Sequence, residues 1–431
     1  MEQRRTAPRV LSLYSGAGGL DLGLEAAGFE TRLCVEVDED ARSTLKANRP
    51  NWTLATPGDI HKQTPEALLR QGGFDVGEVD LLAGGPPCQP FSKSGYWSRG
   101  DSQRLRDPRA ATLQAYLDVV ETAQPRVVLL ENVRGLTYEG KAEGVDLLVK
   151  GIDAINRRKR TRYRVSLFLL NAADFGVPQL RERVFLIADR EGRLFSPPSA
   201  THGSKFGLQP YLTAWDAIGD LANQESDDLC VSGKWAALLP SIPEGHNYLW
   251  HTPEGGGTPL FGWRTRFWSF LLKLSKRRPS WTILADPGPA TGPFHWNSRR
   301  LSTRELCRLQ TIPDNYVIHG DRRSVQRQLG NAVPCALAQT LGLAIRRQLL
   351  GDHRARTTTT LIPARARRTP PAVSVARVPR QFSHLKGNHS RHGGTGKGPL
   401  AQKLARVENL SSLRIVPVVL ANAPHISRAR G

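Results

Sequence analysis

Apolar and polar positions change their spacing regularly over about the first 190 residues. Short, nearly continuous apolar runs alternate with longer segments whose apolar residues recur at helical spacing. We predict strands at Arg9–Ser15, Thr31–Val37, Val79–Ala83, Arg126–Glu131, Arg164–Leu170 and Arg183–Ala188. We predict helices at Leu20–Ala27, Glu39–Asn48, Ala110–Thr122 and Val145–Arg158. This alternation is typical of an α/β fold with a parallel sheet and crossover helices.

The pattern changes after about Glu191. The stretch Phe195–Ser298 is rich in Pro, Gly and Trp and shows little periodicity, which favours a smaller, irregular domain of short strands and loops. Helical spacing returns at Ser302–Gln310 and from about Val333 to Leu349. Beyond residue 350 the composition predicts a tail without fixed structure. We therefore expect four parts, at residues 1–194, 195–298, 299–350 and 351–431.

The 431-residue chain carries 60 Lys+Arg against 39 Asp+Glu, a formal net charge of +21. Residues 352–431 contain 15 Lys+Arg and 2 Asp+Glu, so the tail supplies +13 of this charge and the other 351 residues supply +8. A chain this basic suits a polyanionic partner. The charge of the tail alone leaves a nucleic-acid-binding arm and a solubilising extension equally open.

The five cysteines are scattered along the chain, at positions 34, 88, 230, 307 and 335. They form neither a disulfide framework nor a metal-binding CxxC pattern, so we expect a reducing, cytoplasmic location and no metal. No window approaches about 18 consecutive apolar residues, and the N-terminus lacks a signal-peptide core, so we expect no membrane span. Gly393–Gly398 is similar to a phosphate-binding loop, but Gly398 replaces the required Ser or Thr, and we reject an ATP site.

A glycine-rich turn, Leu13–Asp21, follows the first predicted strand. Its glycines allow a sharp turn and a close backbone approach to a ligand at the carboxyl edge of the sheet. The next strand ends in Val35–Asp38, whose carboxylates suit a ribose diol, and Gly58–Ile60 offers one more carboxylate near an adenine edge. The turn alone is equally typical of an ordinary tight turn. The acidic residues in Val35–Asp38 and Gly58–Ile60, added to this turn, favour a nucleotide site.

A cysteine flanked by prolines stands in the run Gly84–Ser92, directly after a buried strand. Free cysteines are commonly buried as small apolar residues. The prolines around Cys88 argue against burial, because they fix the thiol on a rigid, exposed turn. Basic residues follow in the polar segment 93–109 and would lower the pKa of a thiol. We therefore favour a nucleophile over a buried spacer.

Glu131 ends a buried strand, where a carboxylate is costly unless it has a partner or a function. Arg181 and Arg183 point to the same side of an extended chain, and either is placed to pair with Glu131. A structural ion pair and a functional role are compatible here. The run Gly330–Pro334 by itself is typical of a loop that enters a helix.

Together and in this order, these stretches resemble the C5-cytosine DNA methyltransferases, from about Val10 to Leu350 except for the irregular stretch. The run around Cys88 matches the PCQ element of that family and Glu131–Val133 matches its ENV element. The spacing from Gln179 to Arg183 matches its QxRxR element. The resemblance implies a Rossmann-like methyltransferase sheet over residues 1–194 and a target-recognition domain at 195–298. It also implies that residues 299–350 pack back on the sheet, ahead of the basic tail.

The resemblance further implies S-adenosyl-L-methionine as the cofactor. The chain departs from the family at Tyr14, where Phe is common, and at Val37, where an aromatic residue often stands. A ring is retained at position 14, so stacking on the cofactor should survive. The residues implied to hold the cofactor are Tyr14, Ser15, Gly16, Gly18, Gly19, Glu36, Val37, Asp59, Ile60, Asn331 and Ala332.

The chemistry implied by the resemblance begins with a nucleophile, because C5 of cytosine reacts poorly until the ring is activated by addition at C6. The Cys88 thiolate would add to C6 and form a covalent adduct. Glu131, protonated or sharing a proton, would bind N3 and the exocyclic amine and stabilise charge that builds up in the ring.

Further residues are implied to support this pair. Arg183 would bind O2 of the base and fix Glu131. Arg181 would support the loop and the developing charge. Asn132 would position the backbone of Pro87 and of the following cysteine.

Duplex DNA is the implied partner, and its target cytosine must be flipped out at a cost of a few kcal/mol. Residues 92–109, including Ser94, are expected to close over the flipped base, while the second domain contacts base edges in the major groove. Arg264, Arg266 and Arg299 are the candidates for contact with DNA, with phosphate binding favoured over base contact. We expect a monomer that needs no stable contact with a cognate restriction endonuclease.

Three alternatives stay open beside a sequence-specific DNA methyltransferase of the restriction–modification or bacterial epigenetic type. A near relative uses the same catalytic residues on transfer RNA, although the long stretch between Glu191 and Arg300 favours DNA. A dinucleotide-dependent oxidoreductase is disfavoured because the glycine spacing departs from GxGxxG. A catalytically silent DNA-binding relative is disfavoured because every catalytic motif position is intact.

Overall fold

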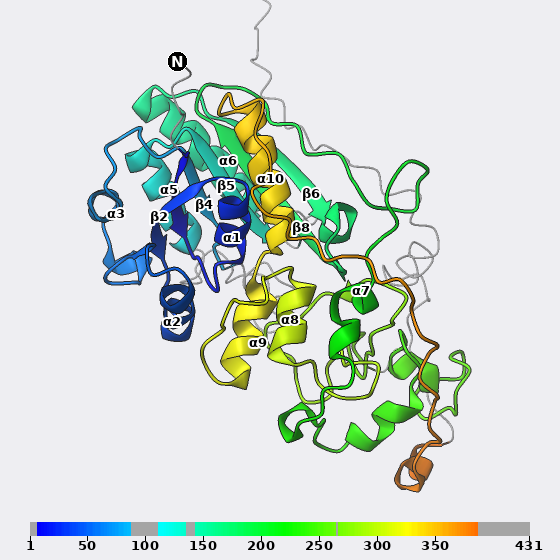
Figure 1. The fold of residues 1–431 in the computed structure, drawn as a ribbon. Helices are drawn as coiled ribbons and strands as arrows, with labels where there is room; N and C mark the ends of the chain where they lie inside the picture. The colour runs from blue at the N-terminus through cyan, green and yellow to red at the C-terminus, as the bar shows by residue number, and fades with distance from the viewer. Residues whose placement is uncertain (1–6, 88–110, 135–142, 264–265, 387–431) are drawn as a thin grey trace, which may run out of the picture.

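The structure, a computed structural model, describes residues 7–87, 111–134, 143–263 and 266–386. Cys88, Ser94 and the rest of segment 92–109 lie outside the described residues, as do Arg264 and the tail from residue 387 onward. The described chain forms a sheet lobe and a small lobe of short helices and loops (residues 213–309), joined side by side (Figure 1).

Within the described residues, seven strands form one sheet in the order β3-β2-β1-β4-β5-β8-β6. The strands are β1 (Arg9–Leu13), β2 (Glu30–Val35), β3 (Thr53–Leu54), β4 (Leu81–Gly84), β5 (Val127–Val133), β6 (Arg164–Asn171) and β8 (Glu182–Asp189). Strands β1 to β5 pair in parallel, as the sequence predicts, but β8 runs antiparallel to both β5 and β6. The expectation of an all-parallel sheet is therefore wrong at β8. The connection from β6 to β8 is too short for a crossover helix, so the chain must turn back on itself.

Helices cover both faces of the sheet (Figure 1). The helices of this lobe are α1 (Gly19–Ala26), α2 (Glu39–Asn48), α3 (Pro65–Gly72), α5 (Ala111–Ala123), α6 (Glu143–Lys159) and α10 (Cys335–Gln348). Leu11 and Leu13 of β1 pack in the core with α3, α5 and α6, whereas Val10 packs in the core with α1 and α10. This alternation is the period of two expected for a strand that is buried on both faces.

The small lobe contains little regular structure, as its Pro, Gly and Trp content predicts. Its elements are α7 (Ala214–Ile218), β9 (Ser280–Trp281) and α8 (Thr303–Leu309). The neighbouring elements outside it are β7 (Gln179–Leu180) and α9 (Arg322–Asn331). The 3-10 turns of the described chain are η1 (Ile60–Lys62), η4 (Ala172–Phe175), η5 (Gly219–Leu221), η6 (Asp227–Leu229), η7 (Ala236–Ser241), η8 (Tyr248–His251) and η9 (Arg380–Leu385). A cluster of aromatic rings around Tyr248, Phe261 and Phe270 forms its core.

The core clusters divide the chain differently from the four expected parts. Ala214 and Ile218 of α7 share a core with Leu306 of α8, and the same cluster includes Leu45 and Trp52 beside the sheet. The part at 195–298 is thus split between two cores. Sequence composition could not locate this division, because it depends on which helix packs on which neighbour.

Residues 351–386, the C-terminal strap, require a correction to the expected tail. The strap leaves α10 and runs as an extended chain from the sheet lobe to the small lobe (Figure 1). Its backbone donates hydrogen bonds from Thr358 to the Ala26 carbonyl (3.0 Å) and from Ala366 to Asp216 Oδ1 (2.7 Å). Phe382 is buried at its end and stacks on Trp235. These contacts offset the chain entropy that the composition alone would leave unopposed.

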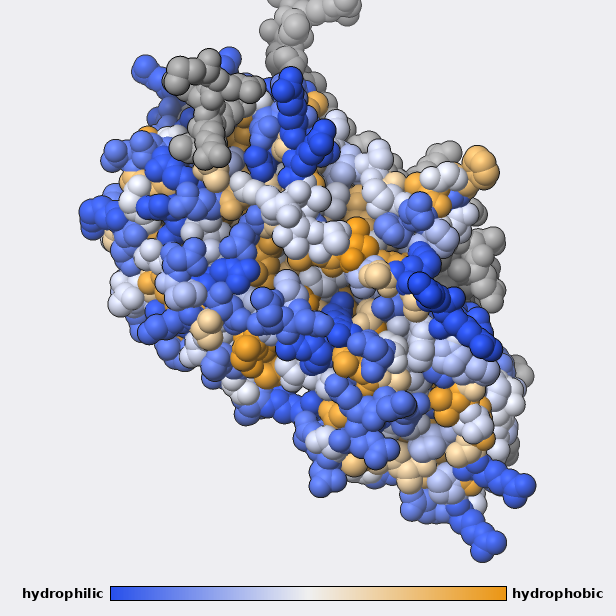
Figure 2. Space-filling model, viewed as in Figure 1, coloured by the Kyte–Doolittle hydropathy of each residue, from blue (hydrophilic) through white to orange (hydrophobic). Residues whose placement is uncertain are grey.

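None of the helices in the described part of the chain combines the length and the apolar surface that crossing a bilayer requires. The face shown in Figure 2 is mostly hydrophilic, with apolar residues gathered toward its middle.

Candidate functional site

The glycine-rich turn joins the carboxyl end of β1 to the start of α1. Gly16 and Gly18 have positive φ angles of 55° and 78°, a conformation that glycine adopts without strain. The backbone N–H of Gly16 donates to Glu36 Oε2 at 2.7 Å, which ties the turn to the end of β2. The side chain of Ser15 donates to Ser12 Oγ at 3.0 Å, below the turn. The turn is therefore a fixed backbone structure.

Glu36 is nearly buried, and both of its carboxyl oxygens have backbone donors. Oε1 accepts from the N–H of Asp38 at 2.8 Å, opposite the bond from the glycine turn. Burial raises the pKa of Glu36, while these N–H groups act to lower it. The next side chain, Val37, is 64% exposed. A fixed carboxylate and an open apolar side chain thus stand next to each other at the edge of the sheet.

A third segment reaches the same edge. A Cβ added to Gly58 would lie 2.1 Å from the carbonyl oxygen of Glu36, so this approach requires glycine. Asp59 follows and caps η1 by accepting from the N–H of His61 at 3.0 Å, and Ile60 is buried beneath. Burial and the nearby Asp59 carboxylate raise the pKa of the Tyr14 hydroxyl. These residues therefore surround one region at the ends of β1, β2 and β3.

The end of α9 completes this region from far along the sequence. A Cβ added to Gly19 would lie 2.5 Å from the carbonyl oxygen of Val333 and 3.1 Å from Cβ of Ala332. Asn331, at the last position of α9, is exposed. The sequence suggested a loop here, whereas Gly330 and Asn331 belong to the final helical turn.

These four segments fit a cofactor that carries a ribose diol and a flat ring. Glu36 supplies a carboxylate whose orientation is fixed by two N–H groups, and the exposed Val37 supplies an apolar contact. The tight turn leaves room for a ligand to approach the backbone of Gly16, because a Cβ there would meet nothing within 4 Å. The predicted cofactor residues thus lie together, and S-adenosylmethionine suits this donor set.

Glu131 and Arg183 form an ion pair at the carboxyl end of β5. Arg183 Nε lies 2.7 Å from Glu131 Oε1, and both side chains are largely buried. Burial raises the pKa of the Glu131 carboxyl, while the positive charges of Arg183 and Arg181 act to lower it. Burial therefore favours the protonated acid, and the arginine next to it favours the carboxylate. Such opposed effects are common where a group exchanges a proton during catalysis.

Arg181 makes its hydrogen bonds elsewhere. It is fully buried, and its guanidinium donates to the carbonyl oxygens of Ile283 (3.2 Å) and Gly330 (2.7 Å). Gln179 is also fully buried and donates to the carbonyl of Leu309 at 3.1 Å. Of the two arginines expected to compete for Glu131, Arg183 forms the ion pair, and Arg181 ties the sheet lobe to the segment after β9 and to α9. Sequence reasoning missed Ile283 and Gly330 as partners, since backbone carbonyls leave no sequence signal.

Asn132 connects this pair to the proline-flanked loop. Its Nδ2 donates to the carbonyl oxygen of Pro86 at 3.3 Å, and its Oδ1 accepts from the N–H of Val133 at 2.8 Å. Pro87 is exposed at the last described position before Cys88. Asn132 thus holds the start of the loop on which the predicted nucleophile stands.

Two of the arginines suggested for DNA contact have other partners. Arg299 donates to both carboxyl oxygens of the buried Glu305, at 2.7 and 2.8 Å. It is a structural residue of the small lobe, so its assignment as a DNA contact is corrected. The guanidinium of Arg266 lies over the rings of Trp235 and Phe270, about 6 Å from each centre, and is exposed.

Comparison with known sequences places these observations in a family. A family model described as C-5 cytosine-specific DNA methylase matches residues 8–347. The chain is 39% identical over 370 residues to the Type II methyltransferase M.SacI of Streptomyces achromogenes, covering 79% of this chain and 93% of that protein. It is 32% identical over 334 residues to the Type II methyltransferase M.NgoFVII of Neisseria gonorrhoeae, covering 76% of this chain and 83% of that protein.

Solved structures show the same fold at low sequence identity. A mutant of DNMT2 from Spodoptera frugiperda superimposes with a TM-score of 0.54 at 18% identity, covering 79% of this chain and all of that chain. The methyltransferase EhMeth of Entamoeba histolytica gives a TM-score of 0.51 at 16% identity, covering 79% of this chain and 98% of that one.

Proposed function

Because the chain belongs to the C-5 cytosine-specific DNA methylase family, and is thus a DNA cytosine-5 methyltransferase, we propose how and on what it acts. It transfers a methyl group from S-adenosylmethionine to C5 of a cytosine that is flipped out of a specific duplex sequence. The observation that carries this proposal is the buried Glu131–Arg183 pair, next to the loop that Asn132 anchors. Because its similar relatives are Type II methyltransferases, we extend the proposal to a restriction–modification role beside a cognate endonuclease.

Cys88 is the proposed nucleophile. Its thiolate adds to C6 of the flipped cytosine, which forms a carbon–sulfur bond and moves electron density toward C5 and N3. Asn132 fixes the carbonyl of Pro86 and thereby positions the loop for this attack.

Glu131 and Arg183 stabilise the charge that this addition produces. A protonated Glu131 donates to N3 of the ring, and its other oxygen accepts from the exocyclic amine. Arg183 binds O2 of the base and keeps Glu131 oriented through the 2.7 Å contact. Burial raises the pKa of the Glu131 carboxyl, which supports the protonated form that N3 requires.

The cofactor is bound by the turn around Gly16, by Glu36 and by the exposed Val37. S-adenosylmethionine, when bound there, supplies the electrophilic methyl group. After methylation, a base removes the proton from C5 and the Cys88 sulfur leaves C6, which restores the aromatic ring and the free enzyme. The proposal makes 5-methylcytosine the product.

The test is bisulfite sequencing of plasmid DNA from a host that has no cytosine methylation of its own. Wild type is compared with Cys88→Ala and with Cys230→Ala, because Cys230 is an exposed cysteine of the small lobe. We expect methylation at one recurring motif with wild type and Cys230→Ala, and none with Cys88→Ala. Normal methylation by Cys88→Ala would exclude the proposed nucleophile. No methylation by a wild type that binds S-adenosylmethionine would exclude duplex DNA as the substrate.

A further inference from the structure

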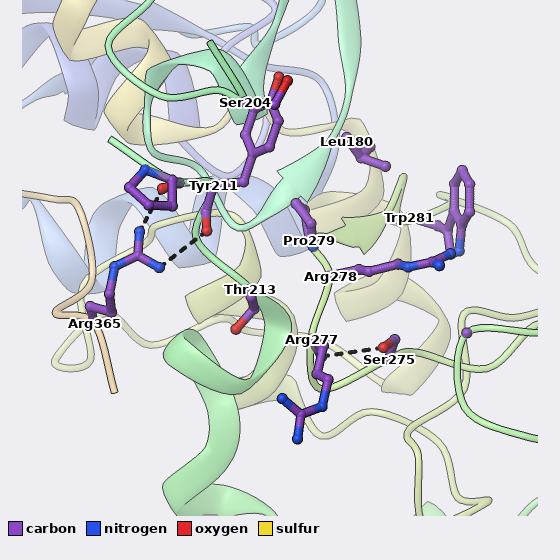
Figure 3. Close-up of a pocket in the computed structure, with 12 residues that line it drawn as sticks. Leu180, Ser204, Tyr211, Thr213, Ser275, Arg277, Arg278, Pro279, Trp281 and Arg365 are labelled. Carbon is purple, nitrogen blue, oxygen red and sulfur yellow. Dashed lines mark hydrogen bonds between the residues drawn. The ribbon is translucent and has the colours of Figure 1, made fainter. Parts of the chain in front are cut away.

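A groove of about 420 Å³ opens where the sheet lobe, the small lobe and the C-terminal strap meet (Figure 3). Leu180 of β7 and Trp281 of β9 line one part of it, and Tyr211 and Arg365 line the other. Its size is within the range of pockets that hold a small ligand or one unit of a polymer.

The chemistry of the lining is cationic. Three of the twelve lining residues are arginines, four carry hydroxyl groups and none is acidic. Arg277 and Arg278 are exposed, and their guanidinium groups form no hydrogen bond or ion pair with the part of the chain that the structure describes. Free guanidinium groups beside hydroxyl donors are a typical arrangement for binding phosphate.

The third arginine belongs to the strap and has a structural role. Arg365 donates to the carbonyl oxygens of Pro210 (2.5 Å) and Tyr211 (3.3 Å) (Figure 3), and its Nη1 lies 3.9 Å from Asp216 Oδ2. It therefore fixes the loop that forms one wall of the groove. The charge of Arg365 is partly compensated by Asp216, whereas Arg277 and Arg278 have no acidic partner among the described residues.

Two histidines near the groove respond to this positive charge. Burial and the charge of Arg278 lower the pKa of His246, and burial and the charge of Arg365 lower the pKa of His202. The charges of Arg278 and Arg365 thus reach side chains next to the groove.

The groove also lies close to the catalytic pair. Leu180 precedes Arg183 by three residues, and three extended residues span at most about 10 Å. The phosphates of a flipped nucleotide must run close to the base pocket, because the base remains attached to the strand.

We propose that this groove binds the sugar–phosphate backbone of the substrate DNA beside the flipped cytosine. Arg277 and Arg278 are the phosphate-binding residues, and the strap completes the groove by fixing its wall through Arg365. The inference rests on the proposed function, since it takes duplex DNA as the substrate. It gives the C-terminal strap, which extends past the matched family region at residue 347, a part in substrate binding.

The test measures the dissociation constant for duplex DNA between 50 and 200 mM salt, with the Arg277→Ala/Arg278→Ala double variant. Two unmethylated duplexes are compared, one that contains the sequence motif that the enzyme methylates and one that lacks it. The control is Arg157→Ala/Lys159→Ala, which removes two exposed charges from the last turn of α6. That turn lies at the amino edge of the sheet, away from the groove, because a crossover helix returns the chain to that edge.

We expect the groove variant to bind both duplexes more weakly by the same factor, and the slope of log K against log salt to fall by about 1.8 for two lost phosphate contacts. The control should retain the slope of the wild type, and all proteins should bind S-adenosylmethionine equally. Weakening confined to the motif duplex would overturn the proposal in favour of base contact. A slope equal to that of the control would exclude the groove from DNA binding, even if wild type methylates DNA normally.

A second variant tests whether the strap supports the wall of the groove. Arg365→Ala should weaken binding to both duplexes equally, because the loop at Pro210 and Tyr211 loses its anchor. Arg367→Ala is the matched control, because it removes one exposed arginine from the same strap two residues away. If Arg365→Ala binds both duplexes as tightly as this control, the strap has no part in the groove. Wild type that neither binds nor methylates duplex DNA would overturn the proposed function together with this inference.

Discussion

Arg183 stands opposite Val133 in the antiparallel pairing of β8 with β5, yet its guanidinium contacts Glu131, two residues earlier on β5. Residues two apart on a strand share a face, so the pair is a diagonal contact across the two strands. A shift of one residue in this register would turn Arg183 to the other face of the sheet. The antiparallel return of β8 therefore determines the geometry of the candidate catalytic pair.

Arg183→Ala should destabilise the protein in a pH-dependent way, because it leaves the Glu131 carboxyl buried without its cation. Burial raises the pKa of Glu131 above its ordinary 4.5, and without Arg183 the pKa should rise further. A raised carboxyl pKa gives stability at low pH that is lost as pH rises above the ordinary value. We expect a loss of about 3 kcal/mol in the free energy of unfolding at pH 8, and a smaller loss at pH 5.

Urea unfolding at the two pH values measures this difference. Arg134→Ala is the control, because Arg134 pairs with Glu182 on the same strand edge but is more exposed. The control should lose little stability and show no pH dependence of the loss. An equal loss at pH 5 and pH 8 for Arg183→Ala would argue against an uncompensated Glu131.

Asp21 should make the wild type less stable as pH rises from about 4 to about 6. The side chain is fully buried in α1, and burial raises its pKa from 3.8 to about 6. In this window the Asp21 carboxyl ionises in the unfolded chain but stays protonated in the folded protein. The free energy of unfolding therefore falls up to about pH 6 and no further. A shift of this size corresponds to about 3 kcal/mol.

Asp21→Asn removes this titration. The free energy of unfolding of the variant relative to wild type should therefore increase between pH 4 and pH 6 and then stay constant. Denaturant unfolding of both proteins across this range measures the difference. A difference that does not change with pH would mean that the Asp21 carboxyl ionises normally in the folded protein.

Gly19→Ala should destabilise the cofactor region, because the added Cβ would lie 2.5 Å from the carbonyl oxygen of Val333. Backbone atoms on both sides must move, and overpacking of this kind costs about 1–3 kcal/mol. We expect a lower Tm and weaker binding of S-adenosylmethionine by calorimetry. Gly288→Ala is the matched control, since its Cβ would meet only the Thr291 side chain at 3.3 Å. If Gly19→Ala binds S-adenosylmethionine as tightly as wild type, the start of α1 is not part of the cofactor site.

Phe382→Ala should destabilise the small lobe, although residue 382 lies far beyond the matched family region. Its ring is buried and stacks on Trp235, with ring centres 5.9 Å apart. Removal of a buried Phe side chain costs about 3 kcal/mol. Unfolding monitored by tryptophan fluorescence should show an earlier transition, while deletion of residues 387–431 should leave the transition unchanged. An unchanged transition in Phe382→Ala would mean that the end of the strap does not contribute to the core.

Secondary structure was predictable where apolar spacing was regular. The helix predicted at Glu39–Asn48 has the same bounds in the structure, and strands β1, β5 and β6 lie within two residues of their expected ends. Three helices of the described chain were missed, among them the five-residue helix Ala214–Ile218. The segment Pro65–Gly72 is short and Arg322–Asn331 is mostly polar, so both have few apolar residues although those few lie on one face.

The candidate site was predictable as a set of residues but not as a set of contacts. Glu36, Asp59 and the glycine turn meet because the carboxyl ends of parallel strands share one edge, which follows from the order of strands and helices. The choice of Arg183 over Arg181 as the partner of Glu131 did not follow. Arg181 and Arg183 are two positions apart on the same side of an extended chain, so the sequence does not distinguish them. Only the carbonyl groups of Ile283 and Gly330, which accept hydrogen bonds from Arg181, do so.

The sequence by itself determined the α/β class, the family resemblance and the residue types of the candidate site, because these depend on residue type, order and local spacing. The tertiary structure alone decided the antiparallel direction of β8, the pairing of Arg299 with Glu305 and the ordered path of residues 351–386. Each of these depends on contacts between segments far apart in the chain. The energy of such contacts comes from burial and from partners that a single sequence position does not reveal.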